Sequence, residues 1–83
     1  MQWDVLLVKP LPDYQLYVEL ADGRKGIFDV KPYMDRGVLQ ELKDIQYFNQ
    51  VGITLGAITW PHDQDIDPET LLDELEETSA SPY

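Results

Sequence analysis

The chain has 83 residues, of which 43% are hydrophobic and 11% aromatic, so it has room for one packed core and not for two independent domains. It contains no cysteine, which excludes a disulfide framework and a zinc–thiolate site. Its formal net charge of −10 opposes binding to nucleic-acid phosphates and to anionic lipid surfaces, because both depend on lysine and arginine.

The apolar runs of the chain do not predict a signal peptide or a membrane span. Residues 1–4 lack the basic start of a signal peptide, and the first apolar run ends at Lys9 and Pro10. No stretch approaches the roughly 18 apolar residues that a membrane helix needs. Small secreted domains more often rely on disulfides, so the lack of cysteine also favours a reducing compartment. We therefore expect a cytoplasmic protein with no membrane partner.

The first half of the chain shows two strand patterns. Residues 3–8 are apolar except for Asp4, which predicts a buried central strand that ends at Lys9 and Pro10. Residues 14–20 alternate between apolar and polar side chains, as in a strand with one buried face. A turn at residues 11–13 separates the two strands.

A hairpin is predicted at residues 21–23. With a three-residue loop and Gly23 in the left-handed conformation, charged residues face charged ones and apolar residues face apolar ones. The resulting pairs are Leu20 with Arg24, Glu19 with Lys25, Tyr17 with Ile27 and Leu16 with Phe28. A two-residue turn would place leucines opposite charged side chains, so we prefer the longer loop.

Short helices and a second hairpin follow. Pro32 predicts a short helix that stops at Gly37, and Asp44 can cap another that ends near Gln50. Apolar residues three apart indicate helical core positions, namely Leu39, Leu42, Ile45 and Phe48. Residues 51–55 and 57–60 flank Gly56 and predict the second hairpin, which Pro61 closes.

The last predicted helix starts at Asp67-Pro68-Glu69, which combines a capping side chain, a proline and an acid in the first turn. Leu71, Leu72 and Leu75 form its apolar stripe. Residues 77–83 have no such pattern, and we expect an acidic, frayed tail. The sequence thus predicts one α+β domain over residues 1–76, whose antiparallel sheet is built from two hairpins plus an N-terminal strand, with two or three short helices.

One group of acids has the spacing of a calcium loop. Asp63, Asp65, Asp67 and Glu74 match ligand positions 1, 3, 5 and 12 of an EF-hand. Position 6 of that loop is a glycine, whereas this chain has Pro68, whose φ is fixed near −65°. A helix cap at Asp67 explains the same residues without a metal, so the four acids are an alternative metal site and not the preferred interpretation.

No residue set predicts catalysis or a cofactor. His62 is the only histidine, and its potential nucleophile partners, Ser79 and Ser81, fall in the predicted tail. The five glycines match neither the dinucleotide-binding nor the phosphate-loop spacing. Without a basic groove, the aromatic residues are core or interface residues and not a stacking platform for nucleic acid. We expect a protein that is not an enzyme and has no catalytic, cofactor-binding or metal residue.

Charge is divided unevenly along the chain. Residues 1–43 hold all six lysines and arginines and seven acids, a net charge of −1, whereas residues 44–83 hold nine acids and no base, a net charge of −9. Such a surface favours a basic partner. It would also be explained by solubility alone, since charge runs are commonly solvated faces.

Several segments together resemble one family. They are residues 8–14, 21–23, 28–33, 42–48, 58–61 and 65–71. Over residues 3–75 the chain resembles the bacterial family of domains of unknown function called DUF2442. The resemblance implies a compact α+β domain with an antiparallel sheet and no established activity. It also implies a gene neighbour that encodes a second small protein, which suggests a toxin and antitoxin pair.

These observations predict a non-enzymatic protein-interaction module that docks a basic protein, as an antitoxin-like partner would. The alternative is a small-ligand or metal-binding accessory domain that uses Asp63, Asp65, Asp67 and Glu74. An enzyme with an unfamiliar carboxylate site is the third hypothesis. Exposed strand edges also allow a homodimer.

Overall fold

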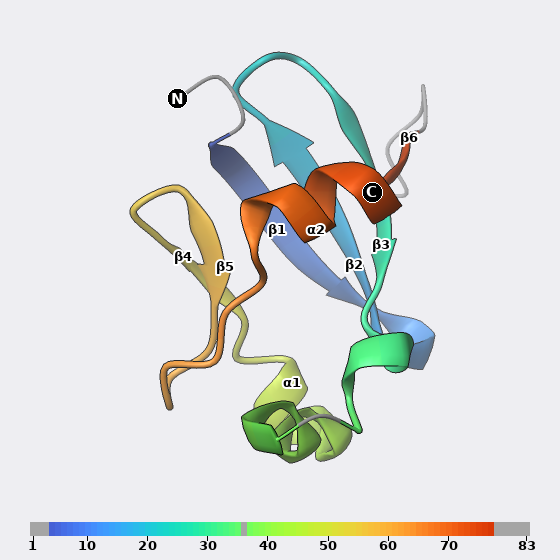
Figure 1. Ribbon diagram of the computed structural model, residues 1–83, viewed down its shortest axis with the longest axis vertical. Coiled ribbons are helices and arrows are strands. Elements are labelled where there is room, and N and C mark those ends of the chain that lie inside the picture. Colours follow the sequence, from blue (N-terminus) through green and yellow to red (C-terminus); the bar gives the residue numbers. More distant parts are fainter. Residues whose placement is uncertain (1–3, 36, 78–83) are drawn as a thin grey trace.

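The computed structural model describes residues 4–35 and 37–77, and it forms two antiparallel sheets with short helices between them (Figure 1). The strands are β1 (Val5–Leu11), β2 (Gln15–Leu20), β3 (Lys25–Asp29), β4 (Gly52–Thr54), β5 (Ala57–Thr59) and β6 (Glu76–Glu77). The α-helices are α1 (Ile45–Phe48) and α2 (Pro68–Glu74), and the 3₁₀ helices are η1 (Pro12–Tyr14), η2 (Lys31–Tyr33) and η3 (Gly37–Lys43). The α+β fold class predicted from the sequence is confirmed.

The β2–β3 hairpin has the register that the side chains predict. Glu19 lies opposite Lys25, and Leu16 lies opposite Phe28. The Leu20 amide donates to the Arg24 carbonyl at 2.8 Å, and Gly23 has a φ of 95°. Only glycine adopts such a φ without strain, so Gly23 allows the three-residue loop. That loop sets the register in which charged residues face charged ones and apolar residues face apolar ones.

The position of the N-terminal strand differs from the prediction of a central strand. In the four-stranded sheet the order is β1-β2-β3-β6, so β1 lies at the edge and β2 is central. The strand also continues through Lys9 and Pro10 to Leu11. Proline has no N–H to donate, so it disrupts a strand that is hydrogen-bonded on both sides. An edge strand is paired on one side only and tolerates proline. Residue 3 of the predicted strand lies outside the described residues.

The second hairpin forms a sheet of its own and does not join the first. Its strands β4 and β5 pair with each other, and Thr59 makes an isolated bridge with Asp65. A backbone hydrogen bond ties its tip to the main sheet, from the Val5 amide to the Gly56 carbonyl at 2.9 Å. The two hairpins are therefore neighbours around one core and not strands of one sheet.

The core lies between the main sheet, the helices and β5. Leu16, Val18 and Phe28 from the sheet belong to the same buried cluster as Phe48 of α1 and Leu71 of α2. In Figure 1, α2 runs across the sheet. Its cap is the predicted one, since the Asp67 carboxylate accepts the Glu69 amide at 3.0 Å.

The segment between the two sheets is mostly 3₁₀ helix. Leu42 and Phe48 are buried as predicted, but Ile45 is 44% exposed, so one of the expected core positions is wrong. Ile45 opens α1, which Asp44 caps by accepting the Gln46 amide at 3.0 Å. A helix of one turn has room to bury only part of its side chains, and here Tyr47 and Phe48 take that place.

The last described residues add a strand that the sequence does not predict. Glu76 and Glu77 pair with Ile27 and Gly26 of β3, so Glu77, expected in the tail, continues the sheet. The rest of the expected tail, residues 78–83, lies outside the described residues. A Cβ on Gly26 would lie 2.2 Å from the Glu76 carbonyl oxygen. The glycine therefore allows β6 to approach β3.

Replacing Gly26 with alanine should displace β6 and lower the free energy of unfolding by about 1–3 kcal/mol, as overpacking does. Urea denaturation measures the loss, and faster amide exchange at Ile27 would localise it. Gly52→Ala is the matched control, because a Cβ there meets nothing within 4 Å. Equal stability of the two variants would show that β6 does not depend on Gly26.

Candidate functional site

The first half of the chain pairs most of its charged groups. Arg24 Nε lies 2.7 Å from Asp22, and Lys43 Nζ lies 2.7 Å from Asp35. Lys31 Nζ bridges η1 and the end of β3 by contacting Asp13 at 2.9 Å and Asp29 at 3.2 Å. These local pairs leave little net charge on this part of the surface.

The pKa values of the paired groups shift in the direction that the pairs require. The hydrogen bond from the Arg24 amide lowers the pKa of Asp22, and the Lys43 side chain lowers the pKa of Asp35. The hydrogen bond to Asp13 raises the pKa of Lys31. A lowered carboxyl pKa stabilises the fold above the unfolded-state pKa, and that contribution is lost as the pH falls through the folded-state value. These groups are exposed, so the effect on stability is small.

The acids of the second half have no such partners. All nine acids from Asp44 to Glu77 are exposed, and within the described residues none of the nine forms an ion pair. Two of them have a structural role, since Asp44 and Asp67 cap α1 and α2. The other seven are Asp63, Asp65, Glu69, Asp73, Glu74, Glu76 and Glu77. We call these seven residues the acidic surface.

The acidic surface follows the chain from β5 to β6. Asp63 and Asp65 lie in the loop after β5, three members lie on α2, and Glu76 and Glu77 form β6 (Figure 1). Because α2 and β6 carry no basic residue, their carboxylates raise the negative potential over this whole side of the chain. A positively charged molecule would find no competing cation there among the described residues of these two elements.

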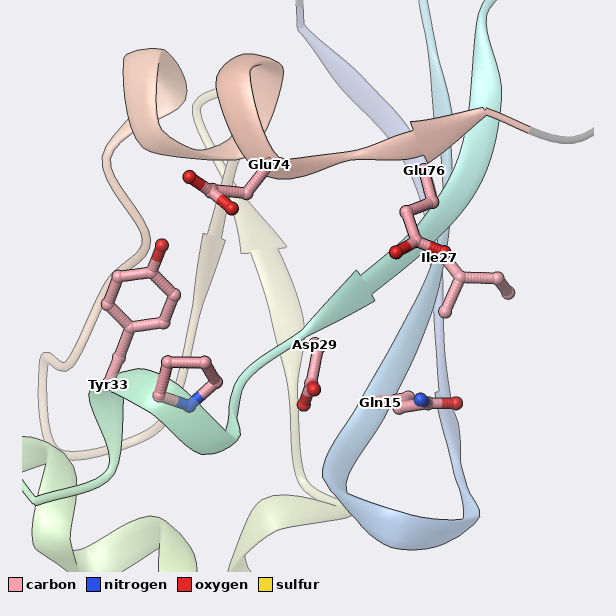
Figure 2. Close-up of a pocket in the computed structure, with 7 residues that line it drawn as sticks. Gln15, Ile27, Asp29, Tyr33, Glu74 and Glu76 are labelled. Atoms are coloured by element: carbon pink, nitrogen blue, oxygen red, sulfur yellow. The ribbon is translucent and has the colours of Figure 1, made fainter.

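A cavity of about 220 Å³ opens beside this surface. Its lining residues are Gln15, Ile27, Asp29, Pro32, Tyr33, Glu74 and Glu76. Figure 2 shows Glu74 extending from the end of α2 toward the Tyr33 ring, with Asp29 on β3 across the cavity. The Tyr33 ring is held by stacking on Phe28, with ring centroids 5.7 Å apart. Asp29 already pairs with Lys31, so Glu74 and Glu76 are the uncompensated carboxylates here.

The four acids of the alternative metal site are not brought together. Glu74 lines the cavity of Figure 2, whereas Asp63 and Asp65 line a groove beside β4 and β5. Asp67 caps α2, and Pro68 occupies the first turn of that helix, where a calcium loop would need a left-handed glycine. Among residues 4–35 and 37–77, no group of three or more histidine, cysteine or acidic side chains could hold a metal ion.

The single histidine belongs to a polar network that the sequence analysis missed. His62 Nδ1 lies 2.5 Å from Glu41 Oε2, and the other Glu41 oxygen accepts Gln64 Nε2 at 2.9 Å. The Tyr47 hydroxyl donates to Gln64 Oε1 at 2.5 Å and accepts the His62 amide at 2.8 Å. The rings of Tyr47 and His62 stack with centroids 5.1 Å apart.

This network fixes the loop before α2 onto η3 and α1. Gln64 is only 2% exposed, and its amide is satisfied by Tyr47, by Glu41 and by the Val38 carbonyl at 3.2 Å. A buried amide needs such partners, so the network satisfies the hydrogen-bonding groups of Gln64. The predicted nucleophile candidates, Ser79 and Ser81, lie outside the described residues. No sequence motif marks the network, because Glu41 and His62 are 21 residues apart.

A family model described as "Protein of unknown function (DUF2442)" matches residues 5–77, which span every strand and helix from β1 to β6. The chain belongs to the DUF2442 family. No curated protein and no solved structure matches the chain. Among the described residues of this DUF2442 chain, no helix has the length and apolar character needed to cross a membrane.

Tyr47→Phe should lower the free energy of unfolding by about 1–3 kcal/mol, because it leaves the buried Gln64 oxygen without its donor. Urea denaturation measures the loss. Tyr14→Phe removes a hydroxyl that bonds the Lys43 carbonyl at an exposed position, where water can replace it. The Tyr14 variant should therefore lose clearly less, and equal losses would contradict the structural role given to the network.

Millimolar calcium should leave the thermal unfolding midpoint unchanged, because the four acids of the alternative metal site do not converge. Differential scanning calorimetry with and without calcium checks this expectation, with magnesium as the control for ionic strength. A rise in the midpoint with calcium alone, abolished by Asp65→Asn, would restore the metal-site hypothesis.

Proposed function

We propose that this chain is a non-enzymatic protein-interaction module whose acidic surface docks a basic partner protein. The observation that supports it is the set of nine exposed acids from Asp44 to Glu77, none of which forms an ion pair within the described residues. Asp44 and Asp67 stabilise the domain as helix caps, but the charges of the other seven repel one another and oppose folding. A basic partner would turn this repulsion into attraction.

The contrast between the two halves of the chain supports the same proposal. Asp13, Asp22, Asp29 and Asp35 all have a basic neighbour within the fold. Within residues 4–35 and 37–77 the acids of α2 and β6 have none, although α2 is folded and β6 is paired in the sheet. The acids of α2 and β6 are therefore carried by a folded backbone while their charge stays uncompensated among the described residues.

An antitoxin-like role fits this chemistry. A compact domain with a net charge of −10 could cover the basic surface of a toxin that acts on nucleic acid, because the carboxylates would compete with phosphates for the same lysines and arginines. We place such a pair in the cytoplasm. The His62 network is satisfied internally, and among the described residues no acids form a metal site, so we propose neither an enzyme nor a metal-binding domain as a second candidate.

Affinity capture from a native lysate tests the proposal. The tagged full chain should recover a basic protein at low salt and release it as the salt is raised, because exposed charges are screened beyond about 8 Å at physiological ionic strength. The acidic-surface variant replaces Glu69, Asp73, Glu74 and Glu76 by the corresponding amides. The control removes the same number of charges from the paired half and replaces Asp13, Asp22, Asp29 and Asp35 by asparagine.

The association rate of the recovered partner, measured by surface plasmon resonance, should fall about tenfold or more for the acidic-surface variant. The control should change it much less, although it has the same net charge. Equal effects, or binding that does not depend on salt, would refute electrostatic docking. Recovery of the chain alone would point to a homo-oligomer and leave the acids with a role in solubility.

A further inference from the structure

The tip of the β4–β5 hairpin has a residue that is unfavourable for folding in two ways. Leu55 is 99% exposed, so its apolar side chain is hydrated. Its φ is 52°, in the left-handed region that leucine seldom adopts. Leu55 and Gly56 are the two central residues of the turn, and both have positive φ, as a type I′ turn requires. Asparagine, aspartate or glycine would suit this position better.

The backbone around Leu55 is firmly held despite this choice of residue. The Gly56 carbonyl accepts the Val5 amide at 2.9 Å, and the hydroxyls of Thr54 and Thr59 are 3.0 Å apart across the two strands. A Cβ on Gly56 would come within 2.7 Å of the Asp4 carboxyl group, so the turn packs closely on the main sheet. The hairpin therefore presents the leucine on a fixed support.

A groove of about 370 Å³ begins next to this turn. Its lining residues are Gln50, Gly52, Ile53, Thr54, Thr59, Trp60, Pro61, Asp63 and Asp65. Gly52 has no side chain to fill it, and a Cβ there would meet nothing within 4 Å. Asp63 and Asp65 are exposed, unpaired members of the acidic surface, and Asp63 also has a positive φ, of 69°. The groove thus combines open volume with two carboxylates.

We infer that the β4–β5 hairpin is the docking point for the basic partner, with a lysine or arginine of the partner in the groove and an apolar patch of the partner around Leu55. This inference rests on the proposed function and assigns it a location. Asp63 and Asp65 provide the charge complement, while Gly52, Trp60 and Pro61 offer contacts to the aliphatic stem of a basic side chain. A fully exposed apolar side chain such as Leu55 gains free energy when a partner covers it, because its surface is then removed from water.

The cavity of Figure 2 is the weaker docking point on the same chain. One of its three carboxylates, Asp29, is already paired with Lys31. Its lining includes none of the large apolar residues that are exposed in the described part of the chain, which are Leu6, Val38, Ile45, Ile53 and Leu55. Two of those five residues lie in the β4–β5 hairpin.

An octapeptide of alternating lysine and leucine is the probe, and an octapeptide of alternating lysine and threonine is its control for charge. Titration into the ¹⁵N-labelled full chain should shift the amide signals of β4, β5 and residues 61–65, and the leucine peptide should bind about tenfold more tightly. Leu55→Asn should weaken the leucine peptide about tenfold. The same change should maintain or raise the unfolding midpoint, because asparagine suits the turn.

Two further variants test the groove and the specificity of the apolar contact in the same titration. Gly52→Val places a side chain in the groove and should therefore weaken the binding of both peptides. The variant should still fold, because a Cβ there meets no neighbour within 4 Å and valine is favoured in strands. Val38→Ser removes an apolar side chain that is 70% exposed on η3 and should leave binding unchanged.

Shifts confined to α2 and β6, with no effect of Leu55→Asn, would overturn the hairpin site and leave the proposed function intact. Failure of both peptides and of the lysate capture would overturn the two together.

Discussion

The side chain of Phe48 is the contact on which the rest of the structure depends. It is fully buried, its ring meets Tyr14 edge to face at 5.3 Å, and it lies 6.0 Å from the Trp60 ring. The Trp60 indole also donates to the Phe48 carbonyl at 2.9 Å. One aromatic residue thus joins the end of η1, the helix α1 and the residue that follows β5. It belongs to the buried cluster that the two sheets share, together with Phe28 and Trp60, whereas among the described residues the backbone link between the sheets is the bond from Val5 to Gly56.

Within the described residues, the lysine and arginine ion pairs of the fold lie in the first half of the chain, and most acids of the second half are left outside them. Lys31 and Lys43 hold elements of the first half together through acids that lie close to them in the fold. The acidic surface takes no part in such pairs, yet it is fixed in place by apolar contacts beneath it, such as Leu71 of α2. A docking surface gains affinity when its charges are ordered before binding, because less entropy is lost. The positive φ of Leu55 destabilises the turn, and the hydrogen bonds of the β4–β5 hairpin offset that loss of free energy.

The local elements could be predicted from neighbouring residues alone. Asp67-Pro68-Glu69 started a helix as its capping chemistry requires, and the register of β2 and β3 followed from pairing Glu19 with Lys25. The same reasoning failed for β1, because an apolar run is compatible with either a central strand or an edge strand that is covered on one side. It also failed for Ile45, whose burial depends on what packs against a one-turn helix.

For this protein the sequence by itself determined the α+β class, the family segments, the turn glycines and the excess of acids after residue 43. Each of these depends on composition or on residues a few positions apart. Only the tertiary structure decided that β6 pairs with Gly26, that Glu41 meets His62, and that Asp63 and Asp65 border a groove beside the exposed Leu55. These relations join residues far apart in the chain or on different faces of a loop. They are set by the way that apolar surfaces pack around one small core, and no local spacing encodes that packing.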